Sequence, residues 1–425
     1  MSNPVPDGWK ESSIGKITAK DSLFSDGDWV ESKDQDPLGT NRLIQLADIG
    51  DGVFINKSSR YMNDEQFERL KCTELKKNDI LIARMPEPLG RACLYPVETG
   101  KAATVVDVAI LRTQNADHYW LMSAINSSDF RYQIDLNASG TTRTRIARGV
   151  LSNISILEPP LPEQQKIAAI LSTVDDVIEK TRAQIDKLKD LKTGMMQELL
   201  TKGIGHTEFK DSPVGRIPVG WDVKPLVDVC ERVCVGFVGT CERYYRQSGV
   251  PMIRTGNLKD GRLDLAEIKY VTREFHAKEK KSQLRRGDLL IARHGSHGAA
   301  CLVPENLGDA NCLNVVIVRA DQNRFLPQFL KYAFNSSSMK ANLGAKSEGS
   351  TQTVISTTEI AKTLFSVPSL SEQHRIVEVL SSLDNKIDAT GEKFEKMLST
   401  KKALMQDLLT GKVRVNVDNK ESAVA

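Results

Sequence analysis

Arginine and hydroxyl side chains in one short segment are the residues best suited to chemistry in this 425-residue chain, and that chemistry is binding to nucleic acid. Residues 140–148 read Gly-Thr-Thr-Arg-Thr-Arg-Ile-Ala-Arg, and residues 349–354 repeat the frame as Gly-Ser-Thr-Gln-Thr-Val. In the major groove arginine pairs with guanine and glutamine with adenine, while hydroxyls and backbone N–H groups bind phosphates. A polar surface loop would have the same composition. The residues that we predict to contact DNA here are Thr142, Arg143, Arg145, Arg148, Gln352 and Thr353.

Charged and aromatic residues elsewhere suit the same role. Residues 243–246 read Arg-Tyr-Tyr-Arg and so place positive charge beside aromatic rings. This pattern favours a nucleic-acid surface, although a solvated loop has it as well. We also include three residues in or beside the loops that follow two equivalent apolar strands. Arg84 and Arg293 end these strands in both halves of the chain, so they position phosphate, bind a partner or support the fold rather than explain different reading. The further residues predicted to contact DNA are therefore Arg243, Tyr244, Tyr245, Arg246, Arg91, His294 and His297.

No pattern in the sequence favours catalysis. There is no GxxxxGK[ST] loop for a nucleotide and no glycine-rich turn for a methyl donor, and Leu161 follows two prolines where an amino-methyltransferase would have an aromatic ring. Cys230, Cys234 and Cys241 have irregular spacing, with His276 as a distant fourth residue, so buried or free thiols are favoured over a zinc site. We therefore predict that the chain has no catalytic residue, no cofactor site and no metal site.

The composition limits the class of protein. With 40% hydrophobic and 27% charged residues, the chain is typical of a globular protein long enough for two or three domains. The net charge of +3 neither requires nor excludes nucleic acid as a partner. Seven cysteines without a framework spacing are typical of reduced thiols, and no apolar run approaches the roughly 18 residues that a membrane-spanning helix needs. We predict a cytoplasmic protein without membrane contact.

Two long helices are predicted to position the candidate segments. A Leu-x-Glu-Gln opening occurs at Glu163 and again at Glu372, 209 positions later (372 − 163), and a Met-Gln-[Glu/Asp]-Leu-Leu-Thr ending recurs at the same interval, at 196–201 and 405–410. Between them, apolar residues follow a 4-3 heptad pattern, which favours a coiled-coil seam about 60 Å long in each copy. A pair of ordinary bundle helices is the alternative. The polar residues that interrupt the apolar rows are duplicated as well: Thr181 with Thr390, and Lys192 with Lys401.

The repeat extends beyond the helices into two globular regions. Residues 43–49 correspond to 252–258, residues 79–84 correspond to 288–293, and a Pro-x-Gly-Trp motif precedes both regions. Short apolar runs predict strands, and helical periodicity predicts helices between them. The predicted strands are 80–84, 105–112, 154–157 and 313–319, and the predicted helices are 64–70, 120–125 and 325–334.

These patterns predict an α+β fold with two pseudo-two-fold-related globular domains, separated by two long antiparallel coiled-coil helices. The order along the chain is domain, helix, domain, helix and a short polar tail. The predicted boundaries are 1–158 for the first domain, 159–203 for the first helix, 204–367 for the second domain, 368–412 for the second helix and 413–425 for the tail.

The duplicated motifs resemble those of the specificity subunits of Type I restriction–modification systems. The resemblance covers essentially the whole chain, and it rests on the Pro-x-Gly-Trp starts at Trp9 and Trp221, the paired Gly-[Thr/Ser]-Thr segments, and the matched helix openings and ends. It implies two target-recognition domains, each of which reads one half of a bipartite site in double-stranded DNA. It also implies that the helix pair sets the gap between the half-sites and docks the modification subunits.

The resemblance implies that the chemistry belongs to partners. Methylation would be performed by two modification subunits, and cleavage and translocation by two restriction subunits, so S-adenosylmethionine, ATP and magnesium would bind there rather than to this chain. Two alternatives remain. A DNA-recognition region that is also an enzyme would need a cofactor motif. A coiled-coil protein-binding scaffold without DNA readout would show no salt-dependent retention on DNA.

Overall fold

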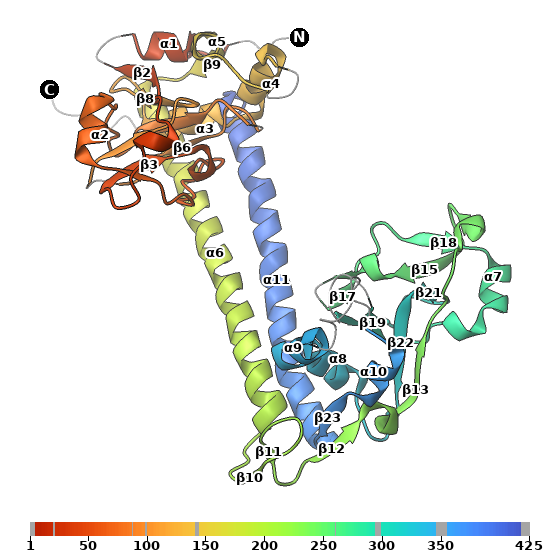
Figure 1. Cartoon of the computed structure of the whole chain (residues 1–425). Helices are drawn as coiled ribbons and strands as arrows, with labels where there is room; N and C mark the ends of the chain where they lie inside the picture. The colour runs from red at the N-terminus through yellow and green to blue at the C-terminus, as the bar shows by residue number, and fades with distance from the viewer. Residues whose placement is uncertain are drawn as a thin grey trace. The chain divides into compact units, whose positions relative to one another are not determined.

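Each half of the repeat forms a compact unit in the computed structural model of the chain (Figure 1). The structure describes residues 5–19, 22–86, 88–97, 100–140, 144–259, 261–293, 299–345 and 355–417. Unit 1 comprises Met1–Arg182 together with Glu392–Ala425, and unit 2 comprises Ala183–Gly391. Each unit therefore contains one globular domain and a part of both long helices.

The globular domain of unit 1 is built on two small sheets. The four-stranded antiparallel sheet has the order β2-β8-β5-β6, and the three-stranded sheet has the order β4-β3-β7, in which β3 and β7 run parallel. A separate antiparallel pair, β1 with β9, joins the start of the domain to its end. The strands are β1 Lys10–Ser13, β2 Leu23–Asp26, β3 Asn41–Ile44, β4 Tyr61–Met62, β5 Ile80–Ala83, β6 Ala92–Leu94, β7 Ala102–Thr104, β8 Val108–Arg112 and β9 Ser155–Glu158.

Two helices of unit 1 begin at side chains that bond to their first turn. Asp117 accepts a hydrogen bond from the backbone N–H of Trp120, and Ser127 accepts one from that of Phe130. The rings of Trp120 and Phe130 are both buried. Each cap therefore fixes a helix whose aromatic side chain belongs to the core. The helices are α1 Ile14–Ile17, α2 Asp64–Arg69, α3 His118–Ile125, α4 Ser128–Asn137 and α5 Arg148–Asn153, with the 3-10 turns η1 Ser32–Asp34 and η2 Leu46–Asp48.

Strand β5 separates the two apolar clusters of unit 1. Its sequence Ile-Leu-Ile-Ala is apolar at every position, as expected for a strand covered on both faces. Ile80 and Ile82 pack in one cluster with Trp120 of α3, whereas Leu81 packs in a second cluster with residues of β3 and β8. The alternation follows because successive side chains of a strand point to opposite faces.

Unit 2 has the same core around the equivalent strand β19. The four-stranded sheet that contains β19 has the order β13-β22-β19-β20. Leu289 and Ile291 of β19 lie in one apolar cluster and Leu290 lies in another. The second sheet has the order β14-β18-β15-β21, and β12 pairs with β23. The strands are β10 Phe209–Lys210, β11 Ile217–Pro218, β12 Asp222–Pro225, β13 Cys230–Val235, β14 Tyr245–Arg246, β15 Val250–Arg254, β16 Leu258–Lys259, β17 Arg262–Leu263, β18 Lys269–Val271, β19 Leu289–Ala292, β20 Ala300–Leu302, β21 Asn311–Leu313, β22 Val315–Ala320 and β23 Leu364–Val367.

The helices of unit 2 follow the order of those in unit 1. The predicted helix at 325–334 and the predicted strand at 313–319 are confirmed, with ends that differ by a few residues. The helices are α7 Arg273–Lys278, α8 Pro327–Asn335, α9 Ser337–Ala345 and α10 Thr357–Lys362, with the 3-10 turns η3 Leu226–Val229, η4 Glu242–Tyr244, η5 Thr255–Asn257 and η6 Lys280–Ser282.

Two long helices, α6 (Leu161–Lys202) and α11 (Leu370–Leu409), each contribute to both units (Figure 1). Gly203 and Gly411 follow their last turns with φ of 66° and 69°, a left-handed conformation that ends helices and favours glycine. No helix among the described residues is long and apolar enough to cross a membrane.

The two long helices run antiparallel. In unit 1, Lys401 of α11 pairs with Asp175 of α6, while Arg182, which is later in α6, lies over the ring of Phe394, which is earlier in α11. The predicted α+β class, the duplicated domains and the antiparallel helix pair are therefore confirmed.

Candidate DNA-recognition surfaces

The segment that holds the predicted arginines of unit 1 is closed at its base. Ser139 and Arg145 exchange two backbone hydrogen bonds of 3.0 and 2.9 Å. Thr142 and Arg143 lie outside the described residues. The guanidinium of Arg145 is 3.1 Å from a carboxylate oxygen of Asp107, and its side chain is 48% exposed. Arg145 is therefore held at one side by a carboxylate and stays open to solvent at the other.

Arg148 and Arg84 share the carboxylate of Asp26. Arg148 lies 3.4 Å from this carboxylate and donates a hydrogen bond of 2.7 Å to the carbonyl oxygen of Phe24. Arg84 lies 3.1 Å from Asp26, is buried, and donates to the carbonyl of Val106 at 2.7 Å. Burial lowers the pKa of Arg84, and the charge of Asp26 opposes that shift.

Three arginines and two aspartates thus meet at the base of segment 139–145, and we call them the arginine cluster: Arg84, Arg145, Arg148, Asp26 and Asp107. The group carries a net positive charge, and its two outer guanidinium groups are almost half exposed. Such a surface can accept a phosphate or a base edge without further desolvation of the buried Arg84.

Unit 2 keeps the inner part of this arrangement. Arg293 donates through Nε to the carbonyl of Ile355 at 3.2 Å, as Arg84 does to that of Ile146 through Nη1 at 3.4 Å. These contacts favour the third of the three roles open to the paired arginines, which is support of the fold. Helix α10 begins with Thr357 where α5 begins with Arg148, so the outer charge is not repeated. The remaining predicted residues of this region lie outside the described residues: Gln352, Thr353, His294 and His297.

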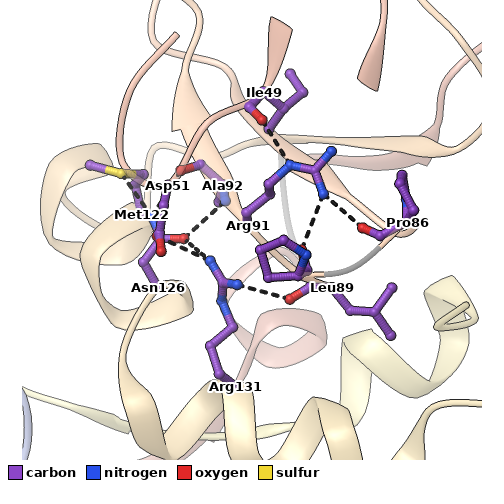
Figure 2. A network of polar contacts seen from close by, with 10 residues as sticks. Ile49, Asp51, Pro86, Leu89, Arg91, Ala92, Met122, Asn126 and Arg131 are labelled. Atoms are coloured by element: carbon purple, nitrogen blue, oxygen red, sulfur yellow. Dashed lines mark hydrogen bonds and ion pairs between the residues drawn. The ribbon is translucent and has the colours of Figure 1, made fainter. Parts of the chain in front are cut away.

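Arg91 has its side chain turned toward the backbone of two segments, and Figure 2 shows its bonds to Ile49 in one and Pro86 in the other. Its guanidinium donates to the carbonyl oxygens of Ile49 at 2.8 Å, Pro86 at 2.7 Å, Pro88 at 3.1 Å and Leu46 at 3.0 Å. Burial lowers the pKa of this guanidinium. Because four of its donor contacts are made within the protein, Arg91 organises the surrounding loops in this structure. A contact of Arg91 with DNA stays a prediction.

A second arginine continues the same network (Figure 2). Arg131 of α4 donates to the carbonyl of Leu89 at 3.0 Å and to the side-chain oxygen of Asn126 at 2.7 Å. Asn126 in turn accepts from the backbone N–H of Ala92 at 2.9 Å and donates to its carbonyl at 2.8 Å. Asn335 makes the same two bonds to Ala300 in unit 2, at 3.3 and 2.7 Å. The asparagine clamp therefore belongs to the shared frame.

The aromatic segment of unit 2 turns its rings inward. The ring of Tyr244 packs against that of Phe275, with 4.9 Å between centroids, and the guanidinium of Arg243 stacks 4.7 Å above Tyr244. The hydroxyl of Tyr245 and the thiol of Cys241 form a hydrogen bond, and burial raises the pKa of Tyr245 to about 12. Arg246 donates to main-chain carbonyls of its own turn. Charge is thus presented outward on a base of packed rings.

Cys241, considered as a zinc ligand from the sequence, is buried beside Tyr245, whereas Cys230 and Cys234 lie on β13. Burial raises the pKa of Cys230 to about 12, which disfavours the thiolate that zinc needs. Within the described residues, no group of three or more His, Cys, Asp or Glu side chains is arranged to hold a metal ion.

The helix openings carry roles that were not assigned from the sequence. In unit 1 the indole N–H of Trp9 donates to Glu163 at 3.1 Å, and Gln164 accepts from the backbone N–H of Asp117 at 2.9 Å. The duplicated Pro-x-Gly-Trp and Leu-x-Glu-Gln motifs are therefore two ends of one contact that joins the domain to α6. Their matched positions in both repeats were the signal that could have revealed it.

Unit 2 makes the same contact with a different third partner. Trp221 donates to Glu372 at 2.9 Å, and Gln373 accepts from the backbone N–H of Leu326 at 2.9 Å. The second carboxylate oxygen of Glu372 contacts the ring of His206 at 2.8 Å. In unit 1 the corresponding carboxylate of Glu163 is bound by Arg414. Each unit thus attaches its domain to the start of one helix with a tryptophan, a glutamate and a cationic or imidazole side chain.

Unit 1 also has a cleft of about 590 Å³ between α3, α4, β9 and the last turns of α11. Apolar and charged side chains both line it, so it is suited to a protein surface of mixed character. Lining residues include Met122, Phe130, Leu398, Met405, Leu409, Lys401, Lys402 and Gln406.

Comparison with known proteins places the chain in a family. The family model described as the Type I restriction modification DNA specificity domain matches residues 6–190 and 218–397. The Type I restriction enzyme MjaVIII specificity subunit of Methanocaldococcus jannaschii is 30% identical over 395 residues, which cover 89% of this chain and 90% of that protein. The Type I restriction enzyme EcoBI specificity subunit of Escherichia coli is 22% identical, over 65% of this chain and 61% of that protein.

Solved structures agree on the fold. One, from work on complex assembly and conformational transition of the type I R-M system, has a TM-score of 0.61 with 15% identity, and covers 97% of this chain and 100% of that one. The Type-I restriction-modification system S subunit from M. genitalium has a TM-score of 0.57 with 13% identity, over 96% and 97% of the two chains. The chain therefore belongs to the type I restriction–modification DNA specificity family, as a specificity subunit with two DNA specificity domains.

Proposed function

We propose that each globular domain reads one half of a bipartite DNA site. The observation that carries this proposal is the duplication of a complete frame, with the tryptophan–glutamate contact at the start of each helix and a charged segment on each domain. In unit 1 the reader is segment 139–145 with Arg145 and Arg148, and in unit 2 it is the turn that presents Arg243 and Arg246. Family membership supports the same assignment.

The helix pair sets the gap between the two half-sites. Helix α6 has 42 residues and α11 has 40, and neither contains a proline beyond the first turn. At 1.5 Å per residue each helix is about 60 Å long, and a paired helix is stiff enough to transmit a fixed distance. A reader of two separated half-sites needs such a spacer.

The chemistry of the assembled system belongs to partner subunits. Two modification subunits dock on the helix pair, where the cleft of unit 1 offers a mixed apolar and charged surface, and they hold S-adenosylmethionine. Two restriction subunits hold ATP and magnesium. This chain contributes no catalytic residue, and the sequence supports that part of the proposal because it has neither a nucleotide loop nor a methyl-donor motif.

The experiment is to assemble the chain with its modification subunits and to sequence the adenines that the complex methylates. We expect one bipartite motif with a single gap length. Exchange of residues 1–158 for the equivalent region of a relative should change one half of the motif and leave the other half and the gap as they were. A continuous motif, or a change in both halves, would contradict the assignment of one half-site to each domain.

A second experiment tests the spacer separately. Four residues added to each helix, after Thr201 and after Thr410, lengthen each by about 6 Å. Duplex DNA rises about 3.4 Å per base pair. Because four extra residues also unwind the seam locally, we expect one or two additional base pairs in the gap, with both half-site sequences unchanged. An active complex that still required the original gap would show that the helices do not set it.

A further inference from the structure

A lysine, an aspartate and a tyrosine from three different elements meet in unit 1. The Nζ atom of Lys401, on α11, lies 2.6 Å from Oδ1 of Asp175, on α6. The phenol of Tyr119, on α3 of the recognition domain, donates a hydrogen bond to Oδ2 of the same carboxylate. One carboxylate therefore joins both long helices and the domain.

The same three residue types meet in unit 2, with the helices exchanged. Lys192 of α6 lies 2.6 Å from Oδ1 of Asp384, on α11, and the phenol of Tyr332, on α8, donates to Oδ2 at 2.7 Å. Lys331 adds a second cation at 3.6 Å. In two antiparallel helices, residues that face each other have residue numbers with a constant sum. The lysine–aspartate pairs of the two units have the same sum, so both pairs belong to one antiparallel register.

These pairs are partly shielded from water. The side chains of Lys192 and Asp384 are 28% and 17% exposed, and those of Lys401 and Asp175 are 23% and 26% exposed. Burial raises the pKa of Asp384, but its hydrogen bonds with Lys192 and Tyr332 outweigh that effect, so the net shift is downward. The carboxylate is therefore ionised at neutral pH and is balanced by the lysine.

The tyrosines reach their carboxylates from different helical turns. Tyr119 lies two residues after Asp117, whose N–H bonds to Gln164, whereas Tyr332 lies six residues after Leu326, whose N–H bonds to the equivalent Gln373. Positions four apart share one face of a helix, so either position can point to the same place. The phenol contact is thus present in both units although the tyrosines are not at repeated positions.

A lysine in an apolar helix seam favours the register that places a carboxylate opposite it. In another register its charge would be removed from water without a partner, which costs free energy. A slip of the helices by one heptad would keep the apolar rows facing each other. It would place Lys401 opposite Ala168 or Arg182, and would remove the carboxylate from Lys192 as well. The heptad pattern alone permits the slip, and the two pairs oppose it.

We propose that the two Lys–Asp–Tyr sites are positioning residues that fix the register of the helix pair and, through it, the gap between the half-sites. The inference rests on the proposed function, in which the helix pair is the spacer. Tyr119 and Tyr332 then attach each recognition domain to the locked pair rather than to one helix alone.

The test moves both carboxylates by one heptad. Asp175→Asn and Asp384→Asn remove the native acids, and Arg182→Asp and Gly391→Asp place new ones opposite the lysines of the slipped register. A Cβ at Gly391 would meet no atom within 4 Å. One heptad is about 10 Å, or about three base pairs. We expect the complex with modification subunits to methylate sites whose gap differs from the original by about three base pairs. Methylation only at the original gap would overturn the proposal.

A matched variant carries Asp175→Asn and Asp384→Asn alone. Asparagine still accepts the phenol hydrogen bonds, so this variant removes only the ion pairs. We expect slower methylation at more than one gap length. A single original gap at the original rate would overturn the register lock, and this variant decides the question if the four-residue variant does not fold.

The wild-type complex separates this proposal from the function beneath it. If the wild type methylates no bipartite site, the proposed function fails. If the wild type uses one bipartite site and both variants keep its gap, the function stands and only the register lock fails. As a rescue, Asp175→Lys with Lys401→Asp and Asp384→Lys with Lys192→Asp restore both pairs in the native register, and we expect the original gap to return.

Discussion

Residues 27–40 of unit 1 and 236–249 of unit 2 occupy the same place between equivalent strands and have equal length, yet their charges are opposite. Both begin with a glycine that the partner strand requires, because a Cβ would lie 2.3 Å from the carbonyl oxygen of Val105 at Gly27 and 2.2 Å from the sulfur of Cys312 at Gly236. The first segment holds four carboxylates and one lysine, and the second holds one carboxylate and two arginines. The backbone anchor is common to both domains, while the charge is not.

The same division runs through the rest of the two units. Within the part of unit 2 that the structure describes, the arginine cluster of unit 1 has no full counterpart. The Arg243 turn of unit 2 corresponds to an acidic stretch in unit 1. In contrast, the Asp79–Arg112 pair and the Asn126–Ala92 bonds of unit 1 are repeated with the same atoms in unit 2, as Asp288–Arg319 and Asn335–Ala300. A pair of domains with one frame can therefore present positive charge from different loops, which is what two readers of different half-sites require.

The largest effect should come from the repeated contact that is most buried. Asp79 accepts two hydrogen bonds of 2.7 Å from Arg112, and Asp288 accepts two of 2.7 Å from Arg319. Both aspartates are 1% exposed. Asp79→Ala and Asp288→Ala each remove the carboxylate partner of an arginine, so each should lower the free energy of unfolding of its own unit by about 3 kcal/mol.

Hydrogen exchange under mild denaturant would measure this loss for each unit separately. Lys202→Ala is the control, because it breaks only an exposed pair with Glu198 and should cost less than about 0.5 kcal/mol. A large loss in one unit with little change in the other would show that the two frames are not energetically equivalent.

The tryptophan contacts should rank next. Trp9→Phe and Trp221→Phe keep a buried ring and remove the indole N–H that binds Glu163 or Glu372. A hydrogen bond to a charged group contributes about 2 kcal/mol, so each variant should lose about that much stability. Thermal unfolding measures the change. Equal losses are expected, because each glutamate retains a further partner; a loss confined to unit 2 would mean that Arg414 alone is enough to hold Glu163.

The elements that the two units share could be predicted from the sequence, because they are repeated in it. The heptad rows and the apolar strands recur after 209 positions and the Pro-x-Gly-Trp starts after 212 (221 − 9), and each repeated element lies in the core or at a helix start. The tryptophan–glutamate contact could have been inferred from the same repetition. Its partners are 154 positions apart in unit 1 and 151 in unit 2, and composition or periodicity alone does not join such distant residues.

The reading surface was less accessible, for a physical reason. An arginine in a polar segment can pair with a carboxylate, bind a backbone carbonyl or face solvent, and only the fold decides among these. Arg91 is predicted from its loop position as a DNA contact, yet its donors bind four carbonyl oxygens. Arg145 and Arg148 are held by aspartates that are distant in sequence, at Asp107 and Asp26.

Replacement of one exposed arginine in each domain should show which half-site that domain reads. Arg145→Ala should weaken binding of the assembled complex by about 1.5 kcal/mol and relax one half-site, and Arg243→Ala should do the same for the other half-site. Binding to oligonucleotides altered in one half at a time measures both effects. Both side chains pair or stack at the protein surface, so stability should change little. A uniform loss on all sequences would assign these arginines to phosphate instead.

The smallest expected effect concerns the threonine that interrupts the seam in each unit. The hydroxyl of Thr181 donates to the carbonyl of Val177 in its own helix at 2.7 Å, and that of Thr390 donates to the carbonyl of Lys386 at 2.7 Å. These two bonds do not select a register across the seam. The Thr181 hydroxyl also lies 3.7 Å from the sulfur of Met397 on α11, but a thioether is a weak acceptor and contributes little to the register. Thr181 is buried whereas Thr390 is partly exposed, so Thr181→Val should stabilise unit 1 by at most about 0.8 kcal/mol and Thr390→Val should change unit 2 less. Thermal unfolding measures the stability and methylated-site sequencing the gap. Neither variant should alter the gap, because the lysine–aspartate pairs remain; a changed gap would assign part of the register to these threonines.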